Sequence, residues 1–259
     1  MPLDLAPDDL LRWYLDCGVD EAVGPVPVDR FALSARPAAA PPPIQRPAPV
    51  PAAAAPAPQV SGTAAHIAAG CADLAELKAA LEAFDALPLR RTANSTVFAD
   101  GNPEAALMII GEAPGQEEDR QGLPFVGKSG KLLDRMLASI GLDRGSAYIT
   151  NVLPWRPLEN RKPSPDEVAV CLPFVARHVE LVDPQVLLLL GGAAAAAILA
   201  RHDGISRLRG QWFDYASPGL SRPVPTLATF HPAYLLRTPD AKRGAWRDLL
   251  MVRKRLDGL

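Results

Sequence analysis

The sequence predicts an α/β protein, a three-layer α/β/α sandwich around a central, mainly parallel sheet of four strands. Two observations support this prediction. Short apolar runs of strand length alternate along the chain with longer segments of helical periodicity. The runs are apolar at nearly every position rather than at every second one, which is typical of parallel strands buried on both faces.

The first half of the alternation begins with an Ala- and Leu-rich segment, 66–84, which predicts a helix. The apolar run 106–111 then predicts a strand that ends in glycine. Apolar residues recur on one helical face over 130–140, so a second helix is expected there. The run 147–153 predicts the second strand.

The second half contains two more strands and three helices. Ser164 can cap the first turn of the helix that follows it. In chain order, we expect a helix at 165–181, a strand at 186–190, an Ala-rich helix at 193–199, a strand at 224–230 and a closing helix at 242–256. Residues 212–215 are a candidate for a further, short edge strand.

Composition divides the chain into three parts. Residues 31–62 are predicted to be a flexible Pro/Ala-rich linker, because such a stretch cannot bury enough apolar surface to offset its ordering entropy. Residues 1–30 contain an amphipathic helical peptide that is too short to fold alone. It could dock on a partner protein or on the main domain, or be a frayed tail. Residues 63–259 are expected to form the α/β domain.

Charge and cysteine usage narrow the possible classes of protein. The formal net charge of −2 gives no global attraction to nucleic acid, so such binding would need a local basic face. The three cysteines are far apart and no CxxC pair occurs, which favours a reducing cytoplasm over a disulfide framework. The start of the chain lacks the pattern of a signal peptide. The apolar stretch 186–200 is too short and too broken by glycine to span a membrane.

Polar and aromatic side chains follow the ends of the expected strands. Glu112, Glu118 and Phe125 come after the first strand, Asn151 ends the second, and His231 follows the last. Each has an ordinary structural explanation: a solvated acid, a core aromatic, a turn-forming asparagine or a structural histidine. The carboxyl ends of parallel strands meet at one edge, however, and ligands bind there in open α/β sheets. We therefore expect one site.

The residue types in this expected site suit chemistry on a flat polar ring. An amide side chain both donates and accepts, so it can recognise the edge of a pyrimidine. An aromatic face can stack on a base, and a histidine can stabilise a developing anion. Carboxylates can orient water or stabilise a cationic sugar.

Five motifs between residues 85 and 256 resemble the family 4 branch of the uracil-DNA glycosylase superfamily. They are Gly-Glu-Ala-Pro-Gly at 111–115 with its trailing acids, Pro-Phe-Val-Gly at 124–127, Tyr-Ile-Thr-Asn-Val at 148–152, Arg156-Pro157 with Asn160-Arg161, and His-Pro-Ala-Tyr-Leu-Leu at 231–236. The resemblance implies the fold of that family. It also implies a monofunctional enzyme that flips deoxyuridine out of DNA and hydrolyses the uracil N-glycosidic bond, starting base-excision repair.

The same resemblance assigns roles to individual residues. It implies catalytic roles for Glu112, Glu118 and His231. It implies substrate binding by Gly111, Ala113, Pro114, Gly115, Phe125 and Asn151. The expected DNA contacts are Arg156, Arg161, Lys162, Arg209, Leu235, Leu236 and Arg237, with Leu235 or Leu236 as the wedge that enters the vacated stack.

The chain departs from the family pattern in two places. Members of this branch usually hold a [4Fe–4S] cluster with four cysteines, whereas the matching positions here are Phe84, Leu87, Trp155 and Cys171. Four thiolates normally ligate such a cluster, so we expect no cofactor and one buried apolar patch at these positions. Ala113 occupies the place of an Asp that activates water in the best known branch, which leaves this task to Glu112, Glu118 or another group.

Two other functions remain open at this point. One is a non-catalytic module that binds uracil or damaged DNA and is recruited through the N-terminal peptide. The other is a flavodoxin-like nucleotide binder, but the acids after the first strand would repel phosphate. We expect a monomeric, cytoplasmic protein of bacterial type that is nucleoid-associated when on DNA and has no membrane contact.

Overall fold

A sheet of six strands lies at the centre of the computed structural model, which describes residues 58–258. The strands are β1 (Asp100–Gly101), β2 (Leu107–Gly111), β3 (Ala147–Asn151), β4 (Val186–Leu190), β5 (Trp212–Tyr215) and β6 (Val224–Thr229). Their order is β1-β3-β2-β4-β6-β5. The four central strands are parallel, and the two edge strands are antiparallel to their neighbours.

The expected number of four strands is therefore corrected to six. The four parallel strands are those expected, and β5 coincides with the edge strand considered at 212–215. Strand β1 was not expected, because two residues are too few to show any periodicity. It exists through its pairing with β3, which is a tertiary contact.

The central strands are buried on both faces of the sheet. All five residues of β2 are buried, and the same holds for β3 and β4. Successive side chains of β2 enter different clusters: Met108 and Ile110 pack on one face, and Leu107 and Ile109 on the other. This explains why the strands are apolar at every position.

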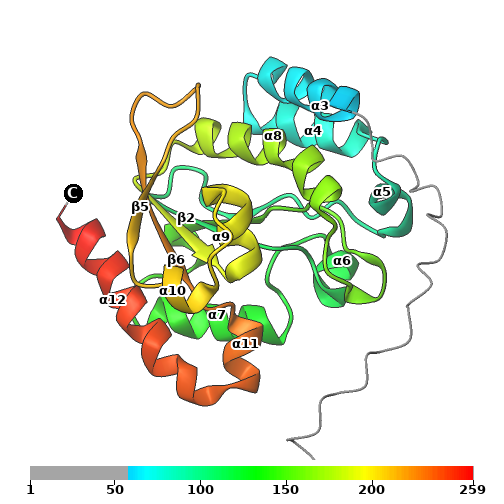
Figure 1. Ribbon diagram of the computed structural model, residues 1–259. Coiled ribbons are helices and arrows are strands. Elements are labelled where there is room, and N and C mark those ends of the chain that lie inside the picture. Colours follow the sequence, from blue (N-terminus) through cyan, green and yellow to red (C-terminus); the bar gives the residue numbers. More distant parts are fainter. Residues whose placement is uncertain (1–57, 259) are drawn as a thin grey trace, which may run out of the picture. The chain divides into compact units, whose positions relative to one another are not determined.

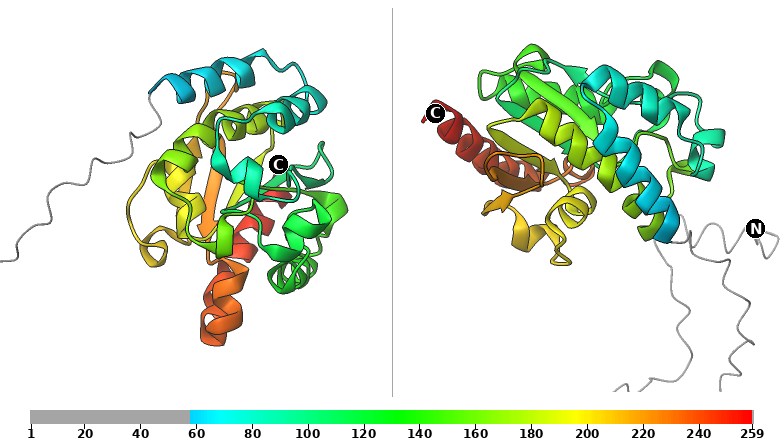
Figure 2. Two further views of the ribbon diagram at one scale, coloured as in Figure 1. Left: turned by 90° about the vertical axis from the view of Figure 1, so that its right-hand side faces the viewer. Right: turned by 90° about the horizontal axis from the view of Figure 1, so that it is seen from above.

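Helices cover both faces (Figure 1). One layer contains α3 (Pro58–Gly70), α4 (Leu74–Ala83), α8 (Pro165–Val182), α9 (Gly192–Leu199) and α10 (Ile205–Leu208). The other contains α7 (Lys128–Ala138), α11 (Pro232–Arg237) and α12 (Lys242–Asp257). The turned views show α3 and α12 on opposite sides of the sheet (Figure 2). The prediction of a three-layer sandwich is confirmed.

Short helices lie in the connections. They are α5 (Pro88–Thr92), α6 (Gln116–Gln121) and the 3₁₀ helices η1 (Arg144–Ser146), η2 (Leu158–Asn160) and η3 (Pro239–Ala241). Helix α6 directly follows β2, and α11 directly follows β6. The two helices thus begin at the edge of the sheet where the parallel strands end.

The expected helix at 66–84 is two helices. Helix α3 ends at Gly70 and α4 starts at Leu74, where the side chain of Asp73 accepts a hydrogen bond from the N–H of Glu76 at 2.8 Å. An N-cap of this kind starts a new helix rather than continuing an old one. Helix α3 also begins at Pro58, so residues 58–62 of the expected linker 31–62 belong to a helix instead. The expected peptide at 1–30 and the rest of the linker lie outside the described residues.

Candidate active site

A pocket of about 540 Å³ opens at the carboxyl ends of the parallel strands. Its walls come from the loop after β2, the end of β3, the loop before α8 and the start of α11. It is lined by Glu112, Ala113, Pro114, Gly115, Glu118, Phe125, Ser129, Asn151, Pro157, Asn160, Arg161, Lys162, Pro163, His231, Ala233, Tyr234 and Arg237. All residues expected to be catalytic lie here, and so do all expected substrate-binding residues except Gly111.

Gly111 lies behind the pocket and allows two other groups to meet. A Cβ at this position would clash with Oδ1 of Asn151 and with the ring of Phe125. The glycine therefore lets the amide and the aromatic ring lie directly over the end of β2. This close approach gives Gly111 a role in the shape of the site without a contact of its own.

Asn151 presents an unsatisfied acceptor. It is the last residue of β3 and its side chain is buried. Within residues 58–258, its Oδ1 is the one buried side-chain nitrogen or oxygen without a hydrogen-bond partner. Buried polar atoms are nearly always paired, so this oxygen calls for a donor from a ligand.

The rings of Phe125 and His231 face the same pocket, with centroids 5.7 Å apart and planes 33° apart. His231 caps α11: its Nδ1 accepts a hydrogen bond from the N–H of Ala233 at 3.1 Å. Burial lowers the pKa of His231 to about 4, the cation of Arg237 adds to this, and Glu118 opposes it. The ring is thus neutral at pH 7 and carries its proton on Nε2.

Glu112 is half-buried at the start of the loop after β2. Burial raises the pKa of its carboxyl group, and the cation of Lys162 acts in the opposite direction. An acid of this kind, in a pocket and beside a single cation, is suited to proton transfer or to charge stabilisation.

Glu118 has a different environment. Its Oε2 accepts a hydrogen bond from the N–H of Gly115 at 3.1 Å, and its Oε1 accepts one from Gly127 at 2.9 Å. Both carboxylate oxygens therefore hold the backbone at the two ends of the segment that carries Phe125. This arrangement gives Glu118 a bracing role in the pocket wall.

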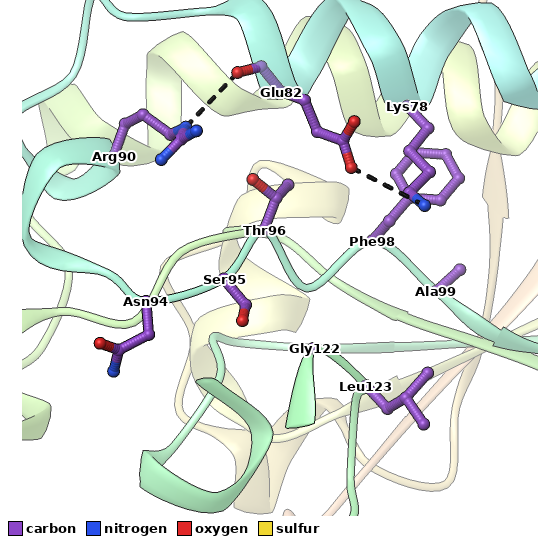
Figure 3. A pocket seen from close by; sticks show the side chains of 10 residues that line it. All are labelled: Lys78, Glu82, Arg90, Asn94, Ser95, Thr96, Phe98, Ala99, Gly122 and Leu123. Carbon is purple, nitrogen blue, oxygen red and sulfur yellow. Dashed lines mark hydrogen bonds and ion pairs between the residues drawn. The ribbon is translucent and has the colours of Figure 1, made fainter. Parts of the chain in front are cut away.

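A second hollow of similar volume lies between α4, α5, the segment 94–99 and residues 122–123 (Figure 3). Its charged side chains are already engaged. Nζ of Lys78 lies 3.7 Å from Glu82, and Arg90 donates to the backbone oxygen of Glu82 at 3.4 Å. None of the predicted site residues lines it, so the active-site candidate remains the pocket at the strand ends.

Comparison with known proteins agrees with this geometry. The sequence profile of the Uracil DNA glycosylase superfamily matches residues 98–250. The chain is 42% identical over 158 residues to a type-4 uracil-DNA glycosylase of Archaeoglobus fulgidus, which is 60% of this chain and 78% of the relative. It is 34% identical over 183 residues to a type-4 uracil-DNA glycosylase of Pyrobaculum aerophilum, covering 69% of this chain and 92% of the relative.

The chain belongs to the uracil-DNA glycosylase superfamily. A type-4 uracil-DNA glycosylase of Thermotoga maritima is also similar, at 38% identity over 153 residues, 59% of this chain and 77% of that one. The predicted membership of this family of enzymes is confirmed.

Of the residues expected to contact DNA, some lie at the rim of the pocket and others lie outside it. Arg161, Lys162 and Arg237 line the rim of the pocket. Arg161 also forms an ion pair with Glu167 at 2.6 Å, and its side chain is 48% exposed, so one face of its guanidinium stays accessible. Arg156 lies just outside, where its Nε donates to Asn160 at 2.8 Å.

Two of the residues expected to contact DNA are engaged within the protein in this structure. The guanidinium of Arg209 is held by Asp248 at 2.7 Å and by the carbonyl of Gly244, away from the pocket. Leu235 is only 1% exposed and packs in the cluster under α11, so it cannot enter a base stack. Leu236, by contrast, is 45% exposed. Burial of the two leucines depends on how α11 packs, which local sequence does not reveal.

Tyr234 is a pocket residue that the sequence did not single out. Its ring is 39% exposed, lines the pocket and lies against Phe230 with centroids 5.1 Å apart. The available signal was an aromatic residue three positions after the site histidine, on the first turn of a helix that starts with His-Pro.

The positions that match the cluster cysteines of the family do not fit an iron–sulfur cluster. Phe84, Leu87, Trp155 and Cys171 are all buried in the same hydrophobic cluster. Trp155 is fully buried and its Nε1 donates to Oγ1 of Thr96 at 3.0 Å. Burial raises the pKa of Cys171 to about 12, which keeps it a thiol. Three of the four side chains carry no sulfur ligand.

The described residues show no other metal centre and no membrane helix. No group of three or more His, Cys, Asp and Glu side chains in 58–258 is arranged to hold a metal ion. No helix in the same range is long and apolar enough to cross a bilayer.

Proposed function

We propose that this chain is a monofunctional glycosylase that flips deoxyuridine out of DNA and hydrolyses its N-glycosidic bond. The observation that best supports this is the unsatisfied Oδ1 of Asn151 at the floor of the pocket. Uracil offers an N–H between two carbonyl groups. The amide of Asn151 can accept from that N–H and donate to a neighbouring carbonyl, a pairing that cytosine cannot match.

The aromatic ring and the histidine complete a pocket for the base. In this proposal the ring of Phe125 stacks on uracil, which contributes about 1–3 kcal/mol. The bond between C1′ and N1 then breaks, and the electron pair leaves with the base, so negative charge develops on its O2. The N–H at Nε2 of His231 donates to this oxygen. A neutral imidazole suits this role because it stabilises the negative charge through a hydrogen bond and keeps its own proton.

The sugar becomes positively charged as the base leaves. Glu112 is the carboxylate in the pocket whose oxygens are not held by backbone N–H groups, whereas those of Glu118 are. In this proposal ionised Glu112 stabilises the cationic sugar and orients the water that adds to C1′. It then accepts the proton of that water. Uracil and an abasic site are the products, which would start base-excision repair.

We also propose that the enzyme works without an iron–sulfur cluster. The burial of Phe84, Leu87 and Trp155 in the same hydrophobic cluster as Cys171 supports this, since three of the four matching positions carry apolar side chains without a sulfur ligand. Iron analysis and visible absorbance of protein purified without oxygen test the idea. Stoichiometric iron with the absorbance of an iron–sulfur cluster would contradict it.

One assay tests the proposed activity directly. A uracil-containing oligonucleotide is incubated with the protein and then treated with alkali, which cleaves the strand at abasic sites. We expect scission with wild type and a loss of about 100-fold or more with N151A, because the buried recognition bond is lost. N102A is the control, since Asn102 lies in the loop before β2 and its side chain accepts a hydrogen bond from the backbone N–H of Glu104, outside the pocket.

The main alternative is a module that binds uracil-containing DNA without catalysis. Tight binding of the oligonucleotide by wild type, with no scission at any enzyme concentration, would favour that alternative. The proposed setting is a monomer in a bacterial-type cytoplasm, nucleoid-associated when on DNA. A partner for the N-terminal peptide also remains a prediction.

A further inference from the structure

The backbone at Phe125 is in an unfavourable conformation. Its φ is 55°, in the left-handed region that side chains with a Cβ rarely adopt. The ring is buried and lies over Gly111, next to Asn151. A residue in this region persists only when the surrounding structure holds it, and such residues concentrate at functional sites.

Arg144 holds this segment through two backbone carbonyl groups. It belongs to η1, just before β3, and its Nη1 donates to the carbonyl of Pro124 at 3.1 Å. Its Nη2 makes a short hydrogen bond to the carbonyl of Phe125 itself. Two consecutive carbonyl groups are therefore held by one guanidinium, immediately before and at the left-handed residue.

The guanidinium is itself held by two acids from other elements. Nη1 of Arg144 lies 2.6 Å from Asp100 of β1, and Nε lies 2.8 Å from Asp134 of α7. The planar fork of arginine makes such simultaneous contacts possible, which the single ammonium group of lysine cannot reproduce.

Gly130 of α7 also lies against the peptide of Phe125. A Cβ at Gly130 would clash with the carbonyl group of Phe125, so the first turn of α7 packs directly on this peptide. The carbonyl group of Phe125 is thus in contact with both Arg144 and the first turn of α7. Small movements of this peptide would turn the ring of Phe125 within the pocket.

We infer that Arg144 is a positioning residue that sets the orientation of the Phe125 ring for stacking on the base. The inference rests on the proposed function, in which Phe125 is the stacking ring. Arg144 does not line the pocket and reaches it through the carbonyl groups of Pro124 and Phe125. Its contribution to catalysis should therefore vanish when the ring is absent.

A double-mutant cycle tests this dependence. R144M removes the guanidinium and F125L removes the aromatic ring while keeping an apolar side chain. We expect R144M to lower kcat/KM by roughly 10- to 100-fold in the wild-type background, the range for a misplaced binding group. In the F125L background we expect less than about a twofold further loss. Equal losses in both backgrounds would overturn the inference.

R177M is a matched control for general destabilisation. Arg177 donates twice to the carbonyl of Cys71 and pairs with Glu180, and its side chain is 24% exposed, against 25% for Arg144. It lies on α8, on the opposite face of the sheet. We expect R177M to lower the melting temperature but to keep kcat/KM within about twofold.

A measurement that needs no activity separates the two proposals. The chain has four histidines, so the ring signals of His231 can be assigned by NMR in the full-length protein. The Phe125 ring, 5.7 Å away, shifts these signals by its ring current. R144M should move them toward their F125L positions, and R177M should not. Unchanged His231 signals in R144M would overturn the positioning role even if no uracil release were found. If the wild type releases no uracil but the His231 signals still shift in R144M, only the proposed function is contradicted.

Discussion

The backbone N–H of Ala233 donates to Nδ1 of His231 at 3.1 Å. Since Nδ1 accepts, the neutral ring must carry its proton on Nε2. One contact within the first turn of α11 therefore decides which atom of His231 can donate to a substrate. Burial, with the help of Arg237, lowers the pKa of this ring to about 4, so the donor is a neutral imidazole at physiological pH.

The lowered pKa of His231 predicts a pH-dependent contribution to stability. In the unfolded chain a histidine titrates at about 6.5. Between that pH and about 4, the unfolded state binds the proton more readily than the folded state. The contribution of His231 to stability is therefore fully present above pH 6.5 and is lost as the pH falls toward 4. We expect the free energy of unfolding of wild type minus that of H231Q to decline by on the order of 2 kcal/mol over this window. Urea unfolding at several pH values measures it, and a constant difference would contradict a neutral buried ring.

We predict that protonation of Glu112 causes the fall of activity at low pH. Its pKa is raised above the ordinary 4.5 by burial, and Lys162 partly offsets this. We expect kcat/KM to fall as Glu112 becomes protonated, and K162M to move this fall to higher pH because the stabilising cation is gone. K254M, on the exposed end of α12, is the control. Single-turnover rates from pH 4 upward measure the limb; its persistence in E112Q would assign it to another group.

Glu118 should act on the pocket wall rather than on the substrate. E118A leaves the N–H groups of Gly115 and Gly127 without their acceptor, and we expect a loss of about 1–3 kcal/mol in stability. The neighbouring Glu117 is exposed and pairs only with side chains of its own helix. E117A should change stability by no more than about 0.5 kcal/mol. Thermal unfolding of both variants measures the difference, and equal effects would refute the bracing role.

Substitution of Leu235 should reduce the stability of the fold, whereas substitution of Leu236 should impair the opening of duplex DNA. L235A creates a cavity under α11 and should cost about 2–5 kcal/mol. L236A should leave stability nearly unchanged but lower kcat/KM on double-stranded more than on single-stranded uracil substrates, because only a duplex needs a wedge. L250A is the control, since Leu250 on α12 is also 45% exposed. A loss that is the same on both substrates would exclude the wedge role.

Trp155 should be a stability residue. It is fully buried in the patch with Phe84 and Cys171, and W155A should cost about 3–5 kcal/mol in unfolding free energy. W246A is the matched control, because Trp246 on α12 is 41% exposed. Denaturant unfolding of both variants gives the comparison. Similar losses in the two variants would contradict a structural role for Trp155.

Local patterns were sufficient for the layers of the fold and for the strand-end residues that meet in the pocket, but not for Tyr234. Apolar runs predicted the four parallel strands, and polar residues at their ends predicted the neighbourhood of Glu112, Asn151 and His231. Strand β1 could not be predicted, because its two residues have no pattern and pair only through β3. The role of Arg144 was equally invisible, since its partners lie 44 positions away at Asp100 and 19 at Phe125.

The sequence by itself determined which functional side chains the chain contains and which strand ends they follow. Both can be derived from the sequence because the periodicity of strands and the residues after them are local properties. Only the tertiary structure decided how each group is used. Burial separates Leu235 from Leu236, and a long-range ion pair commits Arg209 to Asp248, 39 positions away. The packing of α7 and η1 around one peptide orients Phe125. These outcomes depend on contacts between distant segments, which no local pattern encodes.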